Sequence, residues 1–408
     1  MCAPYWRDLL ALPWLRILCL FALPCLAGCR RAPSVSGAWD ASVSVGSTIV
    51  PFRFVVEGDG ADLRGSFFNG NDKITSTTTH VKGETIVFSY PEYGSTLAVR
   101  SAKERLEGTY TYTNEVVYPF EAQRIRPAPT RSAAPTIAGL WTVEVTGKKN
   151  EQAWRLIVGQ SGADVSASIL RLDGDSGAAT GRYDGHKFVL GHFSGARPLR
   201  LELTPQADGT LTVELDSYYT YRAVRAEESL AKGLPEPADP SQFTRLENPT
   251  APFAFSFPDI DGRIVSNTDR RFQHKVVIVS IGGSWCPGCH DEVRFLVDLH
   301  RKYHDRGLEV VFLSFEEARE LKTLDRLRAF VTRYHVDFPV LVAGDTRLVR
   351  LKLPEIVNLE AFPTTLYVGR DGIVRGIHTG FAGTATGSFH QSLTGEMTVT
   401  VERLLAEP

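Results

Sequence analysis

The sequence predicts an α/β domain at the C-terminal end of the chain, preceded by two tandem all-β antiparallel repeats, each a barrel or a meander. The α/β domain is indicated by the continuous β-branched run Val276–Val279, typical of a strand covered on both faces. Apolar residues then recur every three to four positions, as on one helix face, at Val293, Leu296, Leu299 and Tyr303. The β repeats are indicated by short alternating runs between glycine-rich turns.

The N-terminal residues have the pattern of an export signal. Arg7 and Arg16 precede the apolar run Ile17–Ala27, which is too short to span a bilayer and long enough for a signal core. The run ends in Leu26–Cys29, which resembles the lipobox of bacterial lipoproteins. That resemblance implies that residues 1–28 are a signal peptide and that Cys29 carries a lipid anchor. A plain secretory signal with a chance cysteine remains the alternative.

The region between residues 34 and 226 repeats itself. Gly37–Trp39 returns as Gly139–Trp141, an offset of 102, and Phe120–Arg124 matches Tyr221–Arg225 at an offset of 101. We therefore predict a first repeat over 34–126 and a second over 137–226, with about eight strands each, enough to close a small barrel. Each repeat either holds a ligand or partner, or serves as a spacer.

A proline-rich linker is predicted over 227–250, and the α/β domain over 251–408. At 408 residues the chain is long enough for two or three domains. Its net charge of −2, without a long basic block, argues against nucleic acid as a partner. No histidine is spaced to complete a zinc site with the C-x-x-C pair, and we predict no metal and no cofactor.

The most informative motif is Trp285–Cys289, which places two thiols where the predicted strand meets the predicted helix. Unpaired backbone amides and the positive end of the helix dipole stabilise a thiolate there. A cysteine in this position is a nucleophile at neutral pH. The spacing of Cys286 and Cys289 also suits a disulfide between them.

Several segments together resemble the thioredoxin-like TlpA/ResA family of exported, membrane-tethered thiol-disulfide oxidoreductases. They are Phe257–Gly262, an opening hairpin; Val276–Ile281, a central strand; Trp285–Cys289; Glu292; and Ala361–Thr365, a loop with a cis proline. The resemblance implies a thioredoxin-like fold, with Cys286 as the attacking thiol and Cys289 as the resolving thiol. Glu292 would exchange a proton with Cys289. Trp285, Phe362, Pro363 and Thr364 would contact the substrate.

We therefore predict a thiol-disulfide oxidoreductase, lipid-anchored at the extracytoplasmic (periplasmic) face of a bacterial membrane. Its partners would be exported protein thiols or disulfides and a membrane thiol electron donor, and reduction is the expected direction. Two alternatives stay open. One is a cell-envelope binding lipoprotein whose β repeats bind a ligand. The other is a c-type haem protein, because Cys286–His290 also spells C-x-x-C-H.

Overall fold

The computed structural model describes residues 35–102, 104–112, 116–125, 134–148 and 151–408. The predicted signal peptide and Cys29 lie outside these ranges. Residues Val35–Pro408 form one compact unit. Among the residues that the structure describes, no helix combines the length and the apolar character needed to cross a membrane.

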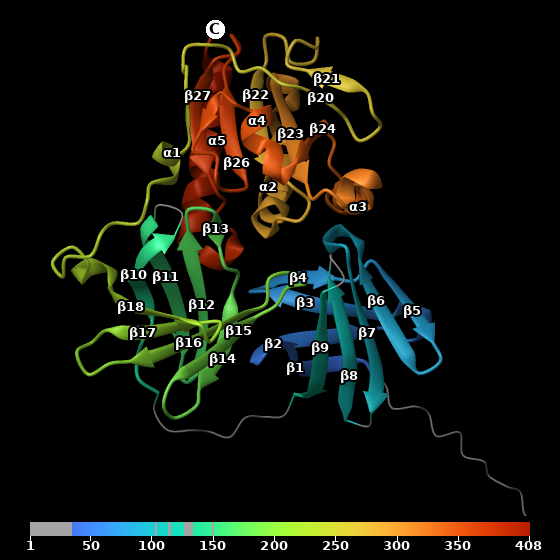
Figure 1. Cartoon of the computed structure of the whole chain (residues 1–408), viewed down its shortest axis with the longest axis vertical. Coiled ribbons are helices and arrows are strands. Elements are labelled where there is room, and N and C mark those ends of the chain that lie inside the picture. The colour runs from blue at the N-terminus through green and yellow to red at the C-terminus, as the bar shows by residue number, and fades with distance from the viewer. Residues whose placement is uncertain (1–34, 103, 113–115, 126–133, 149–150) are drawn as a thin grey trace, which may run out of the picture. The chain divides into compact units, whose positions relative to one another are not determined.

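The first repeat is one antiparallel sheet in the order β4-β3-β2-β1-β9-β8-β7-β6-β5 (Figure 1). Alternate residues along its strands are buried, as in β2, which accounts for the alternating sequence pattern. The strands are β1 (Gly37–Val45), β2 (Thr48–Glu57), β3 (Arg64–Asn69), β4 (Asp72–Thr75), β5 (Thr78–Lys82), β6 (Thr85–Tyr90), β7 (Ser95–Ala102), β8 (Arg105–Tyr112) and β9 (Val116–Arg124).

The second repeat closes into a ring, because β11 pairs with β12 in addition to β10. Its order is β11-β10-β18-β17-β16-β15-β14-β12-β13. The strands are β10 (Gly139–Lys148), β11 (Glu151–Ser161), β12 (Asp164–Arg171), β13 (Gly174–Asp175), β14 (Ala179–Tyr183), β15 (Phe188–His192), β16 (Leu199–Pro205), β17 (Leu211–Leu215) and β18 (Tyr219–Arg225).

The duplicated residues occupy equivalent structural positions. The Trp39 indole donates to the carbonyl of Val35 over 3.0 Å, and the Trp141 indole donates to that of Ile137 over 2.9 Å. An arginine from the last strand covers each indole ring: Arg124 lies 3.9 Å from the Trp39 ring centroid and Arg225 lies 4.0 Å from that of Trp141. The two copies therefore share one way of joining their first and last strands.

The second repeat also contributes a side chain to the core of the first. Phe193 is 1% exposed and belongs to the buried cluster of the first repeat. Its ring centroid lies 5.0 Å from that of Phe52 and 5.1 Å from that of Phe67. The hydroxyl of Tyr110 donates to the carbonyl of Gly195 in the same loop. Tyr110 itself is fully buried.

The C-terminal domain is built on a five-stranded sheet in the order β24-β23-β22-β26-β27. The first three strands are parallel, and the last two are antiparallel to their neighbours. The strands are β22 (Val276–Gly282), β23 (Leu308–Glu316), β24 (Val340–Asp345), β26 (Thr364–Val368) and β27 (Val374–Thr379), and the helices are α2 (Pro287–Tyr303), α3 (Asp325–Tyr334), α4 (Val349–Lys352) and α5 (Ser388–Ala406).

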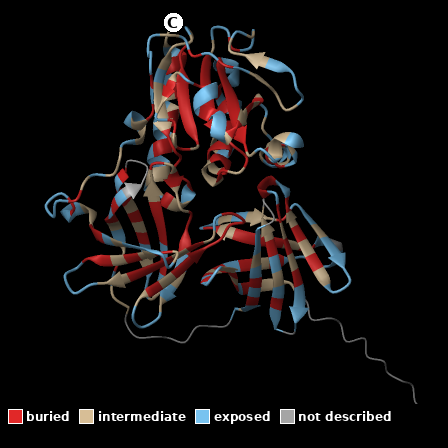
Figure 2. Cartoon of the chain, viewed as in Figure 1, coloured by how far each residue is buried: buried red, intermediate tan, exposed pale blue. Residues whose placement is uncertain are grey.

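Both faces of this sheet are covered. Strands β22 and β23 are buried along their whole length, as the continuous red of these strands in Figure 2 shows. Side chains of α2, α3 and α5 pack on one face, where Ile278 and Phe312 lie, and residues around α4 pack on the other, where Val279 and Leu313 lie. This two-sided burial explains the uninterrupted apolar sequence of the strands.

The remaining short elements connect the domains or lie at the sheet margin. They are α1 (Pro240–Phe243), β19 (Arg245–Leu246) paired with β25 (Ile356–Val357), and the hairpin of β20 (Ser256–Pro258) and β21 (Ile264–Ser266). Glu316 ends β23, and the next α-helix, α3, begins at Asp325.

Candidate functional site

The dithiol lies where β22 ends and α2 begins. Cys286 is the N-cap residue of α2, and Pro287 is the first helical residue, where the missing amide hydrogen of proline costs nothing. The Cys286 Sγ accepts a hydrogen bond from the backbone amide of Cys289 over 3.3 Å. It thus occupies the place where helix amides stabilise a negative charge. Both cysteines are free thiols.

The two thiols differ in their surroundings. Burial raises the pKa of the Cys289 thiol well above its ordinary value, and the neighbouring Cys286 and Glu292 raise this pKa further. Cys289 is fully buried and packs beneath Gly282, where an added Cβ would stand 2.7 Å from the sulfur. Cys289 is therefore held as a protonated thiol in the resting dithiol, as a resolving cysteine requires.

Glu292 lies one helical turn beyond Cys289 and is 1% exposed. Its carboxylate accepts a hydrogen bond from the Ser280 hydroxyl of β22 over 2.5 Å and another from the Thr365 hydroxyl of β26. Burial raises the pKa of Glu292 to about 7, and the two hydroxyls only partly offset that rise. A carboxyl group with this pKa takes up and releases protons near neutral pH, which suits general acid–base work.

The Phe362–Pro363 peptide bond is cis, as the family resemblance implied. The carbonyl of Phe362 accepts a hydrogen bond from the Cys286 thiol over 3.4 Å, so the loop faces the dithiol. A Cβ on Gly288 would stand 3.2 Å from the Cδ of Pro363, which accounts for glycine between the cysteines. The Trp285 ring packs edge-on against that of Phe362, with centroids 5.6 Å apart.

Thr364 differs from this group. It is fully buried, and its hydroxyl donates to the carbonyl of Ala361 over 2.9 Å. Its side chain supports the proline loop, and its contact with a substrate stays a prediction.

Sequence reasoning missed a buried ion pair that holds the loop before Cys286. Glu316, at the end of β23, accepts hydrogen bonds from the backbone amide and the hydroxyl of Ser284 over 2.7 and 2.8 Å. Arg326 of α3 donates to Glu316 over 3.0 Å and to the Ser284 hydroxyl over 2.8 Å. The available signal in the sequence was Glu316, a charged residue at the end of an apolar strand. That strand lies beside the one that leads to the dithiol.

His290, which follows the second cysteine, is committed to packing. One ring nitrogen contacts the Tyr334 hydroxyl and the other the carbonyl of Ser284, both over 2.8 Å. Its ring stacks on that of Tyr93 from the first repeat, with centroids 4.4 Å apart. Burial lowers the pKa of His290 to about 3. Since both nitrogens have partners, neither is available to a haem iron, and the C-x-x-C-H alternative loses support.

Cys286 is only 2% exposed. Its surroundings form a cavity of about 210 Å³, and residues of the second repeat make up much of the wall. The lining includes Cys286, Gly288, Phe362, Arg171, Asp175 and Arg197. Charged side chains of the second repeat therefore share this cavity with the Cys286 sulfur.

A half-buried carboxyl group, that of Asp291, lines this cavity. Burial raises the pKa of Asp291 to about 7; Arg294, its ion-pair partner, lowers this pKa, and the nearby Asp175 raises it. The backbone amide of Gly383 donates to Asp175 over 2.6 Å. Asp291 was not singled out from the sequence, because an aspartate in the first turns of a helix is ordinarily solvated.

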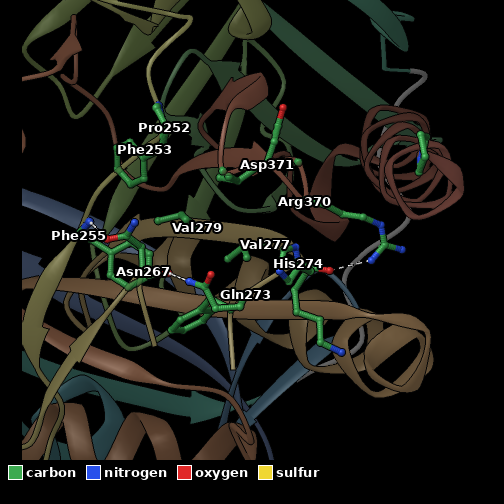
Figure 3. A pocket seen from close by; sticks show the side chains of 16 residues that line it. Pro252, Phe253, Phe255, Asn267, Gln273, His274, Val277, Val279, Arg370 and Asp371 are labelled. Carbon is green, nitrogen blue, oxygen red and sulfur yellow. Dashed lines mark hydrogen bonds between the residues drawn. The ribbon is translucent and has the colours of Figure 1, made fainter. Parts of the chain in front are cut away.

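A larger cavity, of about 520 Å³, lies toward the other end of β22 (Figure 3). Val277 and Val279 of the sheet line it together with Phe253 and Phe255. Arg370 at its margin donates to the carbonyl of His274 over 2.9 Å, so this arginine serves to hold the loop. No cysteine lines this cavity, which separates it from the thiol chemistry.

Comparisons with known proteins agree with this geometry. Residues 249–377 match the model of the AhpC/TSA family. The thiol-disulfide oxidoreductase ResA of Bacillus cereus is 26% identical over 120 residues, which cover 29% of this chain and 62% of the relative. The thioredoxin-like protein YneN of Bacillus subtilis is 29% identical over 126 residues, which cover 31% of this chain and 68% of the relative.

Solved structures were matched as well. A thiol:disulfide interchange protein of the thioredoxin family from Chlorobium tepidum is 22% identical, with a TM-score of 0.31, covering 42% of this chain and 100% of that one. A secreted Mycobacterium tuberculosis disulfide oxidoreductase is 17% identical, with a TM-score of 0.28, covering 37% and 96%.

The fold class predicted from the sequence is confirmed: two antiparallel β repeats precede a thioredoxin-like α/β domain. The resemblance of that domain to the ResA family is confirmed too. The β repeats lie outside the matched residues 249–377, and the chain spans 62% of the length of the ResA relatives.

Proposed function

We propose that this protein is an extracytoplasmic thiol-disulfide oxidoreductase that reduces exported protein disulfides through Cys286 and Cys289. The observation that carries the proposal is the position of the Cys286 sulfur, which accepts from a helix N-terminal amide and faces the cis Phe362–Pro363 peptide. Similarity of the C-terminal domain to ResA supports the same chemistry.

The reaction balances as a two-electron exchange. The Cys286 thiolate attacks one sulfur of the substrate disulfide, and the other sulfur leaves as a thiolate that takes up a proton. Cys289 then loses its proton to the Glu292 carboxylate and attacks the Cys286 sulfur of the mixed disulfide. The substrate leaves as a dithiol, and Cys286 and Cys289 are left as a disulfide.

A second thiol pair must reduce the Cys286–Cys289 disulfide to complete the cycle. Reduced nicotinamide cofactors are absent outside the cytoplasm, so we assign the electron supply to a membrane thiol donor. A lipid on Cys29 would hold the domain near that donor. Reduction of the substrate is the direction that we propose for this exchange.

The test is to trap the mixed disulfide in the full-length chain with Cys289→Ala. Without the resolving thiol, Cys286 should remain linked to exported proteins, visible as adducts on non-reducing gels that dithiothreitol removes. The matched control is Cys286→Ala/Cys289→Ala, which should give no adducts. Failure of Cys289→Ala to trap any exported protein would contradict the proposed function.

The direction is tested separately, by equilibrating the dithiol with glutathione buffers. A reductase should have a reduction potential near that of thioredoxin, about −270 mV, and a value near about −120 mV would instead indicate an oxidant. If the double cysteine variant kept the cellular phenotype intact, the β repeats would carry the function, as in a binding lipoprotein.

A further inference from the structure

A group of metal-ligand side chains lies at the end of α2 that is remote from the dithiol. His300 belongs to α2, His304 begins the short 3₁₀ helix His304–Arg306, and Glu309 lies on β23. One ligand atom from each of the three lies within 4.8 Å of the other two. Cys289 is 11 residues from His300, about 16 Å along a helix, so the two sites are separate.

His300 is the strongest part of the evidence. It is 6% exposed, and its Nδ1 lies 2.9 Å from a carboxylate oxygen of Asp337. That contact fixes the proton of a neutral imidazole on Nδ1 and leaves the lone pair on Nε2. The Nε2 atom is buried and has no hydrogen-bond partner. It lies 4.0 Å from a carboxylate oxygen of Glu309, too far for a hydrogen bond.

Glu309 occupies the point between the two imidazoles. It is 5% exposed, and its other carboxylate oxygen lies 3.2 Å from the Nδ1 of His304. A buried carboxylate facing a buried imidazole lone pair is unfavourable unless a cation lies between them. The His304 ring lies against that of His300, with centroids 4.8 Å apart, and its side chain is 51% exposed, so it can adjust to complete the set.

We infer that His300, His304 and Glu309 bind a divalent transition-metal ion, with zinc as the best fit. In a tetrahedral zinc site with bonds of about 2.0–2.1 Å, neighbouring ligand atoms lie about 3.3–3.4 Å apart. The contact of Glu309 with His304, at 3.2 Å, is close to this separation, and the 4.0 Å between Glu309 and His300 would have to shorten slightly. Two imidazoles favour zinc over magnesium or calcium, which prefer oxygen ligands. Asp337 orients His300 as the carboxylate behind a metal-bound histidine does. A water molecule would complete the four ligands.

This inference departs from the expectation of no metal. That expectation was based only on histidines that could complete a metal site with the cysteines. His300 and His304 are instead paired across one helical turn, and Glu309 follows only after the chain has turned into β23.

The test is calorimetric titration of ZnCl₂ into the full-length chain with all six cysteines replaced by serine, which removes thiolate ligands. We expect one zinc ion per chain. His304→Ala, which changes an exposed side chain, should weaken the affinity at least tenfold, and Asp337→Asn should weaken it about 10- to 100-fold. His80→Ala, which removes an exposed histidine of the first repeat, is the matched control and should change nothing.

A second measurement does not depend on the cysteine replacements. Co²⁺ added to the wild-type full-length chain should give the visible absorption of tetrahedral cobalt without thiolate charge-transfer bands, and His304→Ala should abolish it. Absence of a one-to-one zinc complex, or equal zinc affinity of the parent and His304→Ala chains, would overturn the inference. Neither readout measures thiol exchange, so the proposed function is unaffected by the result.

Discussion

At the scale of single residues, the proposed thiol chemistry depends on the protonation states of Cys289 and Glu292. Cys289 and Glu292 are both buried, and burial raises the pKa of each. The pKa of Glu292 is about 7 and that of Cys289 lies well above its ordinary value. At neutral pH the carboxyl group is therefore partly ionised while the thiol keeps its proton. In the proposed exchange, a proton passes from Cys289 to Glu292 only when Cys289 attacks, which links the two residues in the second step.

The same pKa predicts how stability depends on pH. Glu292 titrates at about 7 when folded and near 4.5 when unfolded, so the protonated carboxyl favours the folded state. Its contribution, roughly 3 kcal/mol, is fully present below pH 4.5 and is lost as the pH rises through 7. Glu292→Gln, which stays neutral, should therefore gain up to roughly 3 kcal/mol in free energy of unfolding relative to wild type between pH 5 and pH 8.

Urea unfolding of both proteins at the two pH values checks this prediction. Glu396→Gln, at an exposed carboxyl group of α5, is the control and should show no such gain. The same Glu292→Gln chain should resolve mixed disulfides more slowly near neutral pH. If the difference in free energy of unfolding between Glu292→Gln and wild type were the same at pH 5 and pH 8, the proposed role of Glu292 would be contradicted.

Single residues also show how far sequence reasoning reached. The strand-to-helix context placed Cys286 and Cys289 correctly, because the N-terminus of a helix is a local feature that sequence pattern reveals. The burial of Cys286 was not predictable, because it depends on residues about 90 to 115 positions earlier in the chain that line the same cavity. The partner of the Thr364 hydroxyl is a backbone carbonyl, which no side-chain pattern indicates.

At the scale of elements, the loop that carries the dithiol is held by β23 and α3. The carboxyl ends of the parallel strands β22 and β23 meet at one sheet edge, which brings Glu316 to Ser284. The strand continued to Glu316 because its carboxylate has four buried hydrogen-bond donors there.

This arrangement predicts a large effect from one substitution in α3. Arg326→Met leaves the Glu316 carboxylate buried without its cation, which should lower the free energy of unfolding by about 3–5 kcal/mol. Arg328→Met on the same helix breaks an exposed ion pair with Asp261 and should cost no more than about 1 kcal/mol. Urea unfolding of the two variants measures the difference in free energy of unfolding. Similar losses in both would show that the buried ion pair stabilises the fold no more than the exposed one.

At the scale of the whole molecule, the duplication produced two unequal copies. The sequence offset predicted two equivalent β repeats, and the matching Trp39 and Trp141 contacts bear out their common origin. Closure could not be predicted from the offset. In the second repeat β12 pairs with both β13 and β14, whereas among the described strands the equivalent strand β3 of the first repeat pairs with β4 but not with β5. The first sheet is therefore left open between β4 and β5 among the described strands.

Phe193 of the second repeat packs into the hydrophobic core of the open first repeat. This contact gives a prediction for both repeats. Phe193→Ala should remove about 3–5 kcal/mol of stability, and the loss should fall on the first repeat, whose aromatic core the ring fills. Hydrogen exchange followed by mass spectrometry should show faster exchange in β2 and β3 than in β16 and β17. Tyr218→Ala, at a 71% exposed site of the second repeat, should change neither. Faster exchange confined to the second repeat would mean that Phe193 supports only its own domain, and the repeats would then be independent spacers.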